Sequence, residues 1–462
     1  MSRLQLARAE AEVIASGSAS KNYHDPGYHQ PKDMRRFLLI AFAYPPVEIV
    51  GSVRPAALAK YLPRYGWEAL VLTPKRQVPR ESDQIIETGY RDVLGEWKAR
   101  LGLDRQLGVH EQFGLATAKK PGSKLRHTRL LTFAKYILTY PDPFKGWIPF
   151  ALEAIEEIRR QKLDISAIVT TSPPISCHLI GRHARNILGC PWVVDFRDLW
   201  TQNLGEHNFQ QLQGRLEKRT LKDADALVTV SQPWAERLQA RYPEKKIFAI
   251  PNGFDPDDYR SPAPALTREF SITYTGELYQ GQRDPTQLFE VLSDLLKEGT
   301  ILSDDLRVRF YGFVEPWLPV QVEKFGLTQV VELHGPTQRQ KVFGHQRESQ
   351  VLLTLPWSDP RETGHHSAKL FEYLAARRPV LAVGGTKGVL TEALEQTHAG
   401  LHATSKTQLR EFLLAAYAEY KKQGRVSYGG DSQAIAQYSH PEMARSFGRV
   451  LDGVAVTEKS LV

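Results

Sequence analysis

The sequence predicts an α/β protein made of two doubly wound, Rossmann-like domains. From Arg35 onward, short apolar runs that suit buried strands alternate with Gly/Pro turns and longer helical stretches. This alternation is typical of a parallel sheet flanked by helices. It begins again after Pro251-Asn252-Gly253, and 462 residues are enough for two globular cores of ordinary size. We therefore expect two such domains, with the boundary near residue 250.

The composition is that of a globular protein, with 42% hydrophobic and 24% charged residues. No stretch reaches the roughly 18 uninterrupted apolar residues that a spanning helix needs, and the nearest run, from Phe37 to Val47, is broken by proline. The two cysteines, Cys177 and Cys190, are too few for a disulfide framework and suit a reducing compartment. A net charge of +8 favours anionic partners such as nucleotide phosphates, anionic lipids or nucleic acid. We expect a cytoplasmic protein, either soluble or peripheral at the inner face of a membrane.

In the first half of the chain, five apolar runs are predicted to be buried strands, and each ends at a loop with polar or proline residues. Ligands of open α/β sheets lie at the carboxyl ends of the strands, so these loops are candidate binding segments. The loops contain Tyr44-Pro45-Pro46, Thr171-Ser172-Pro173-Pro174, Arg197-Asp198 and Ser231-Gln232. The predicted strands cover residues 37–43, 69–73, 167–171, 192–196 and 226–230.

The second half repeats this pattern, with predicted strands at 271–275, 307–312, 330–334, 351–355 and 380–383. The Asn-Gly pair and the Pro/Asp cluster at 256–264 mark the linker between the two halves. A helix around Pro441 to Val454 is expected to cross back to the first domain and brace the hinge. The predicted organisation is a tail at 1–34, domains at 35–250 and 251–435, and a C-terminal helix and tail at 436–462.

A long insertion from Gln77 to Lys145 is predicted to interrupt the first domain. It contains a basic cluster from Lys119 to Arg129 beside the apolar Leu130 to Leu138. Contact with a membrane or an extended acceptor would explain this composition, and a solvated amphipathic helix would explain it equally well.

The segment from His365 to Pro379 carries the most chemical information. Ser367 suits an N-cap, and the helix must end before Pro379. Lys369 and Glu372, three residues apart, are expected to share one face of this helix, while Leu370 faces inward. A helix start favours phosphate, and a carboxylate one turn later suits the two hydroxyls of a ribose. The alternative is an ordinary surface ion pair between Lys369 and Glu372.

This segment resembles the donor-binding motif of the family-4 (group 1) glycosyltransferases of GT-B fold, in which two Rossmann-like domains face each other across a cleft. Seven further segments resemble the same family in the same order, so the resemblance spans residue 37 to about residue 455. The segments read YPPVEIVGSVR, PDPFKGW, TTSPPISCHLIG, WVVDFRDLW, VTVSQPWAERL, IPNGFDPDDY and YTGELYQGQRDP.

In the second domain, the resemblance implies a nucleotide-sugar donor site. Glu372 matches the carboxylate that binds the donor ribose, and Arg283, seven residues after Gly276, matches the basic residue on the donor pyrophosphate. Lys369 is a second cation for the same phosphates, and both cations are expected to stabilise the leaving group. A solvated loop arginine is the alternative for Arg283. The remaining expected donor contacts are Gly276, His366, Ser367 and Leu370.

In the first domain, the resemblance implies one donor contact and an acceptor site. Gly51 matches a turn that lets the backbone approach the donor. Arg54, Ser172 and Arg197 are expected to contact the acceptor. Asp198 is expected to orient or deprotonate the acceptor hydroxyl, where many family members carry a histidine nearby. A buried structural Arg–Asp pair at this strand end is the alternative.

Two positions depart from the family pattern. The first glutamate of the family motif lies eight residues before the ribose-binding one, and that position is Gly364 here, with Glu362 nearby but offset. Glu277 replaces the basic residue that often follows the first glycine of the second domain. These changes affect the expected sugar contacts more than the nucleotide site. They are similar to the pattern of subfamilies that build bacterial surface polysaccharides.

The resemblance implies a retaining transferase that moves a sugar from a nucleoside diphosphate, UDP or GDP, to a hydroxyl of a glycan or lipid-linked acceptor. No Asp-x-Asp motif follows a strand, so we expect no metal requirement and no further cofactor. A nucleotide-sugar epimerase of the same fold and a degenerate nucleotide-sugar-binding partner subunit are the alternatives. No G-x-G-x-x-G follows the first strand, which disfavours a dinucleotide oxidoreductase, and no nucleic-acid reading motif is present.

Overall fold

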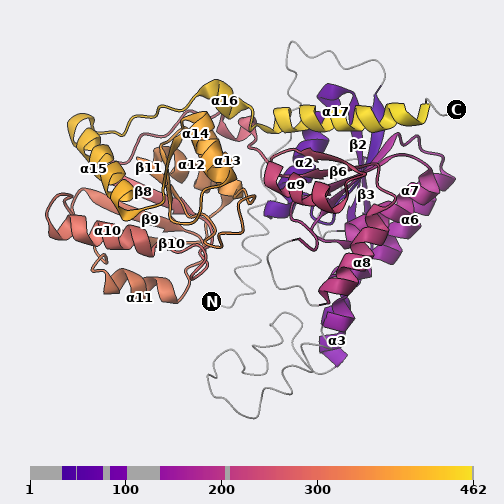
Figure 1. Ribbon diagram of the computed structural model, residues 1–462, viewed down its shortest axis with the longest axis horizontal. Coiled ribbons are helices and arrows are strands. Elements are labelled where there is room, and N and C mark those ends of the chain that lie inside the picture. The colour runs from indigo at the N-terminus through magenta and orange to yellow at the C-terminus, as the bar shows by residue number, and fades with distance from the viewer. Residues whose placement is uncertain (1–33, 48, 76–83, 101–135, 203–208, 460–462) are drawn as a thin grey trace, which may run out of the picture.

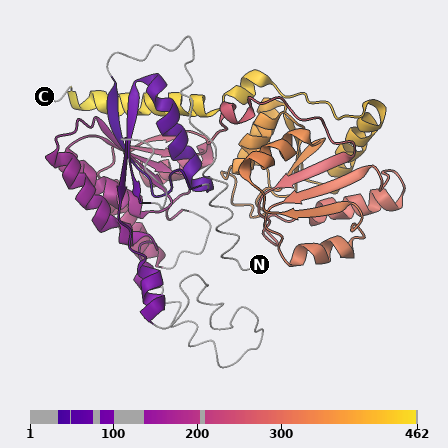
Figure 2. The same cartoon turned by 180° about the vertical axis from the view of Figure 1, so that it is seen from behind.

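The computed structural model describes residues 34–47, 49–75, 84–100, 136–202 and 209–459. Two α/β lobes lie side by side, the first built from the N-terminal half of the chain and the second from the C-terminal half (Figure 1). The view from behind shows the same two lobes, spanned along one side by the C-terminal segment (Figure 2). No helix in the described ranges is long and apolar enough to cross a membrane.

Seven parallel strands form the sheet of the first lobe, in the order β3-β2-β1-β4-β5-β6-β7. This confirms the predicted parallel α/β arrangement. The central strands are buried and largely apolar because helices cover both faces of the sheet. The strands are β1 Arg35–Ile40, β2 Trp67–Pro74, β3 Ile85–Thr88, β4 Ala167–Ser172, β5 Trp192–Phe196, β6 Ala226–Thr229 and β7 Lys246–Ala249.

Helices α6, α7, α8 and α9 cover one face of this sheet, and α2 with the short helix η1 lies on the other. Trp147 and Trp192 are completely buried on the first face. The helices are α2 Val50–Tyr61, η1 Leu62–Tyr65, α3 Val93–Arg100, η2 Lys145–Trp147, α6 Ile148–Arg160, α7 Ser176–Leu188, α8 Gln210–Leu221 and α9 Gln232–Arg241.

The second lobe has six parallel strands in the order β10-β9-β8-β11-β12-β13. Both sheets therefore have the strand order of a doubly wound dinucleotide-type fold, as predicted. The strands are β8 Phe270–Thr275, β9 Leu306–Tyr311, β10 Val331–Gly335, β11 Val351–Thr354, β12 Val380–Val383 and β13 Gly400–Ala403.

Helices α10, α11 and α15 pack on one face of the second sheet, and α13, α14 and α16 pack on the other. The helices are η3 Pro256–Tyr259, α10 Thr286–Lys297, α11 Trp317–Lys324, α12 Arg339–Glu348, α13 Ala368–Ala376, α14 Val389–Thr397, α15 Lys406–Gln423 and α16 Ser432–Ala436.

Three strands were not predicted from the sequence: β3, β7 and β13. All three lie at an edge of their sheet. β3 also corrects the predicted insertion at 77–145, because its residues pair with β2 and extend the first sheet. The basic cluster from Lys119 to Arg129 lies outside the described residues.

The last helix, α17 His440–Lys459, lies across the first lobe although it follows the second in the sequence (Figure 1). Met443, Phe447 and Leu451 on α17 pack in the same core as Leu58 and Tyr61 on α2. The chain therefore passes between the lobes twice.

The two passages lie side by side. The Phe254 N–H donates to the Tyr438 carbonyl over 3.0 Å, and the His440 N–H donates to the Phe254 carbonyl over 2.8 Å. Gly253 is tightly packed here, since a Cβ at this position would lie 2.5 Å from the Tyr438 carbonyl oxygen. This paired crossing forms the hinge between the lobes.

Candidate active site

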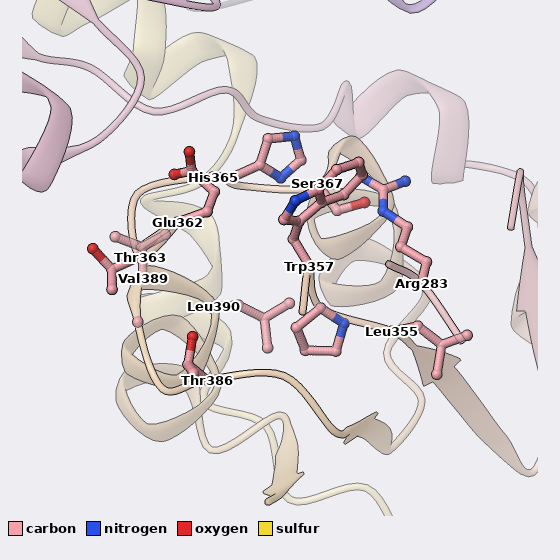
Figure 3. Close-up of a pocket in the computed structure, with 12 residues that line it drawn as sticks. Arg283, Leu355, Trp357, Glu362, Thr363, His365, Ser367, Thr386, Val389 and Leu390 are labelled. Carbon is pink, nitrogen blue, oxygen red and sulfur yellow. The ribbon is translucent and has the colours of Figure 1, made fainter. Parts of the chain in front are cut away.

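The strand order of the second sheet reverses between β8 and β11. Such a switch point opens a crevice at the carboxyl edge of a parallel sheet. The structure has a recess at this place, between the loop that follows β11, the start of α13 and the start of α14 (Figure 3). Its lining includes Arg283, Trp357, Glu362, His365 and Ser367.

Arg283 lies on the loop from β8 to α10, on the wall of this recess. Its guanidinium is 5.6 Å from the ring centre of Tyr279 and 5.7 Å from that of Trp357. It makes no ion pair with any carboxylate in the described part of the chain. The neighbouring Asp284 instead accepts from the Thr286 N–H over 2.8 Å and caps α10. The solvated arginine considered for this position does not fit such a placement.

Lys369 lies in the first turn of α13, and its ammonium donates to the Tyr274 hydroxyl over 3.0 Å. Burial, and then the nearby positive charge of Arg283, lower the pKa of Lys369 to about 7. Gly276 makes room for this side chain, because its φ is +130° and a Cβ would lie 2.1 Å from Lys369 Cε. The alternative of a surface ion pair with Glu372 is wrong, since Lys369 pairs with no described carboxylate.

Glu372, one turn further along α13, has a carboxylate that is 18% exposed. Gln346 Nε2 donates to its Oε2 over 3.0 Å, and Arg339 Nη2 lies 3.3 Å from its Oε1. Both partners come from α12, and neither was singled out in the sequence. They hold the carboxylate at the carboxyl edge of the sheet, where it can accept two further hydrogen bonds.

The start of α13 brings the other expected donor contacts close together, with one exception. Ser367 is the N-cap and lines the recess, although its side chain makes no capping bond. Burial lowers the pKa of both His365 and His366 to about 4, so both rings are neutral near pH 7. The contact expected from Leu370 is wrong, because its side chain is fully buried in the core and its N–H donates to the Ser367 carbonyl over 3.0 Å.

The two lobes meet beside this recess through Glu362 and helix α9. Trp234 Nε1 donates to Glu362 Oε1 over 3.0 Å, and Arg237 Nη1 lies 3.9 Å from Glu362 Oε2. The departure at Gly364 is explained here, since a Cβ at that position would lie 2.3 Å from Trp234 Cδ1. In the sequence, Glu362 was noted only as a glutamate offset from the position of the family's first glutamate, Gly364. Nothing in the sequence pointed to Trp234 as its partner.

In the first lobe, Arg54 does not reach an acceptor site. It is 3% exposed, and its guanidinium binds both carboxylate oxygens of Asp195 at 2.9 to 3.1 Å. It also donates to the Pro251 carbonyl and to Asn252 at the hinge, over 3.2 Å and 3.1 Å. The acceptor contact expected from Arg54 is therefore corrected to a buried ion pair that ties α2 to β5 and the hinge. The alternative considered for Arg197 and Asp198, a structural ion pair at this strand end, is not formed between those two described residues.

Arg197, after β5, is held by carbonyl groups. Its Nε donates to the Ser172 carbonyl over 3.1 Å, and its terminal nitrogens donate to the carbonyls of Gly51 and Pro173. Gly51 lies in the first turn of α2, where a Cβ would lie 2.8 Å from Arg197 Nη1. The space left by this glycine is thus filled by the Arg197 guanidinium. The Ser172 side chain is buried beneath this cluster.

Asp198 follows Arg197 and faces the second lobe. Burial raises the pKa of its carboxyl, the charge of Arg197 opposes this, and Glu362 of the second lobe raises it further. Asp198 makes no hydrogen bond or ion pair within the described ranges. Asp198 is thus close enough to the second lobe for the charge of Glu362 to act on its carboxyl.

The comparisons with known proteins agree with this geometry. Residues 51–253 match the family model described as a glycosyl transferase 4-like domain. No curated protein matched the sequence. Among solved structures, sucrose-phosphate synthase from Thermosynechococcus elongatus is 16% identical with a TM-score of 0.51, over 92% of this chain and 98% of that chain.

Two further solved structures cover both lobes. HepE from Anabaena, in complex with UDP and glucose, is 13% identical with a TM-score of 0.55, over 91% of this chain and 100% of that chain. The trehalose 6-phosphate synthase of Burkholderia multivorans is 10% identical with a TM-score of 0.56, over 93% and 98%. At these identities the likeness shows the shared fold, which is the GT-B fold expected from the sequence. Residues 51–253 are thus similar to glycosyl transferase 4-like domains, and the chain as a whole has the GT-B fold.

Proposed function

We propose that this glycosyltransferase moves a sugar from a nucleoside diphosphate to a hydroxyl of a glycan or lipid-linked acceptor, with retention of anomeric configuration. The observation that carries the proposal is the pair of cations at the switch point of the second sheet. Arg283 and Lys369 lie together there, and neither is paired with a described carboxylate. Both side chains are half-buried, where cations without carboxylate partners are costly, and a bound diphosphate would compensate them.

The donor site follows from these groups. The diphosphate would lie against Arg283, Lys369 and the N-terminal end of α13, whose free N–H groups and dipole favour negative charge. Glu372 would accept both ribose hydroxyls, held in place by Gln346 and Arg339. HepE was solved with UDP, which supports UDP as the first nucleotide to test. These cations would neutralise the leaving diphosphate, so we propose that no metal ion is required.

The acceptor side is proposed to centre on Asp198. When the bond between the anomeric carbon and the phosphate oxygen breaks, the electron pair passes to the diphosphate, and the acceptor oxygen forms the new bond to the same carbon. Asp198 would orient the acceptor hydroxyl, and its raised pKa suits a group that receives a proton. Arg197 would support this site through its carbonyl contacts at the ends of β4 and α2.

Two features extend the proposal. The departures at Gly364 and Glu277 support an assignment to bacterial surface polysaccharide synthesis. The net charge of +8 supports a position at the anionic inner face of a membrane, where a lipid-linked acceptor would lie. Sedimentation with anionic liposomes at low salt tests the second point, and failure to sediment would refute it.

The test of the donor site is thermal unfolding of wild type and of Glu372→Ala with UDP, GDP, ADP, dTDP and their sugars. A ligand that binds only the folded state stabilises it, by about 2.7 kcal/mol at a concentration of 100 Kd. We expect one nucleotide to stabilise wild type and to lose this effect in Glu372→Ala. Glu395→Ala, at an exposed position on the neighbouring helix α14, is the matched control and should respond like wild type.

Turnover is measured separately, as nucleotide released from the stabilising nucleotide sugar, with and without EDTA. Release in EDTA supports a metal-independent transferase. Tight donor binding with no release, even with a panel of sugar acceptors, would favour the degenerate subunit. If none of the four nucleotides stabilises wild type, the proposed donor site is wrong.

A further inference from the structure

Arg283 lies beside two aromatic side chains that come from different loops. Tyr279 precedes it on the loop between β8 and α10, and Trp357 follows β11. The two ring centres are 6.0 Å apart, with an angle of 55° between the ring planes. Figure 3 shows Arg283 and Trp357 on the same wall of the recess. The guanidinium therefore lies against a pair of neighbouring aromatic rings, 5.6 Å and 5.7 Å from their centres.

The choice of aromatic partners has a chemical consequence. A carboxylate beside Arg283 would occupy the N–H groups that bind phosphate oxygens and would have to be displaced by the ligand. An aromatic ring attracts the cation through its quadrupole and leaves the N–H edge of the guanidinium available. The nearest carboxylates are turned elsewhere. Asp284 caps α10, and Glu277 accepts from the Tyr279 hydroxyl over 2.6 Å.

Hydrogen bonds keep the two loops together. Ser358, next to Trp357, donates from its hydroxyl to the Gly281 carbonyl over 2.7 Å and from its N–H to the Gln282 carbonyl over 3.1 Å. The Arg283 N–H donates to the Tyr279 carbonyl over 2.8 Å, which closes the first loop on itself. The position of the two rings relative to Arg283 is therefore set by the backbone of both loops.

We propose that Tyr279 and Trp357, two adjacent rings on one side of Arg283 that we call the aromatic clamp, position Arg283 for the diphosphate of the donor. This inference rests on the proposed function, because it assigns Arg283 to phosphate binding. Tyr279 and Trp357 act through Arg283 and are positioning residues. The clamp takes over part of the ordering that a second basic residue at position 277 would supply in the family pattern.

The ligand is whichever of UDP, GDP, ADP and dTDP stabilises wild type. The experiment measures the Kd of this nucleoside diphosphate by calorimetry for wild type, Trp357→Leu and Tyr279→Leu. The nucleoside without phosphates is titrated in parallel. Loss of one ring should weaken diphosphate binding about 3- to 30-fold. Binding of the nucleoside should change by less than about twofold. Trp357→Phe keeps a ring and should recover most of the diphosphate affinity.

A double-mutant cycle separates positioning from direct contact. If Trp357 acts through Arg283, Trp357→Leu should have little further effect in an Arg283→Ala background, so the two losses should not add. Phe248→Leu, which removes an exposed aromatic ring from the edge strand β7 of the other lobe, is the matched control and should bind like wild type.

The outcomes distinguish the clamp from the proposed function. Wild type that binds none of the four diphosphates overturns both. Wild type that binds one of them, with equal losses for diphosphate and nucleoside in Trp357→Leu, or with fully additive losses in the cycle, overturns the clamp and leaves the donor site in place. A phosphate-dependent and non-additive loss supports the clamp.

Discussion

Replacing Lys369 by methionine should stabilise the free protein and abolish donor binding. Burial and Arg283 lower the pKa of Lys369 from 10.5 to about 7, so the folded state disfavours the charged form. At about 1.4 kcal/mol per pKa unit, this difference corresponds to an upper bound of roughly 5 kcal/mol. Partial solvent access and the lost hydrogen bond to Tyr274 reduce the expected gain to about 1–2 kcal/mol. Methionine keeps most of the apolar contacts of the lysine side chain.

The sign of the pH dependence follows from proton linkage. Below about pH 7 Lys369 is protonated in both the folded and the unfolded state, and the full penalty is present. Between pH 7 and 10.5 only the unfolded state keeps the proton, so the stability of wild type rises with pH relative to the variant. The advantage of Lys369→Met should therefore be largest near pH 6 and should shrink toward pH 10.

The assay is urea unfolding of wild type and Lys369→Met at pH 6, 8 and 9.5, together with calorimetric titration of the stabilising nucleotide. Lys297→Met, at an exposed position at the end of α10, is the matched control and should change stability by less than about 0.5 kcal/mol at every pH. A Lys369→Met variant that is less stable than wild type at pH 6, or that binds nucleotide normally, would refute the reasoning.

Two further predictions concern contacts that support the site. Arg54→Met should lower the free energy of unfolding by about 3–5 kcal/mol, because it leaves Asp195 buried and unpaired. The control is Arg160→Met, at a side chain that is 64% exposed, which should change the free energy of unfolding by less than about 1 kcal/mol. Urea unfolding measures both, and equal effects would contradict a buried ion pair. Gly364→Ala should cost about 1–3 kcal/mol in thermal unfolding, since its Cβ meets Trp234 of the other lobe. The control is Gly344→Ala, at a helical glycine with open space around it, which should be neutral or stabilising. If Gly364→Ala were also neutral, the lobes would not pack at this point.

The sequence predicted the interior of both sheets well and their edges poorly. Nine interior strands were predicted because both faces of such strands are buried, which leaves a continuous apolar run in the sequence. Of the edge strands of the two described sheets, β10 was also predicted. The strands β3, β7 and β13 escaped prediction because each lies at an edge. Residues 246–249 alternate between exposed and half-buried positions, and β13 starts with a glycine. A short, partly exposed strand is hard to distinguish from a loop by periodicity alone.

The candidate site, like the sheets, was predicted only in part from the sequence. The segment around α13 was recognised because helix signals, a cation and a carboxylate stand close together in the sequence. Its partners were not recognised, because Gln346 and Arg339 for Glu372, and Tyr274 for Lys369, come from other elements. Arg54 was misassigned for the same reason, since its partner Asp195 is 141 residues away in the chain.

The sequence by itself determined the class of fold, the two lobes and the order of the motifs, because apolar periodicity and turn residues are local properties of the chain. Only the tertiary structure decided which charges are paired. It placed Arg54 in a buried ion pair and brought Glu362 to Trp234 across the lobes. Among the residues that the structure describes, it gave Arg283 and Lys369 no carboxylate partner. The free energy of a charged group depends on its burial and its neighbours, and both are set when distant segments pack together.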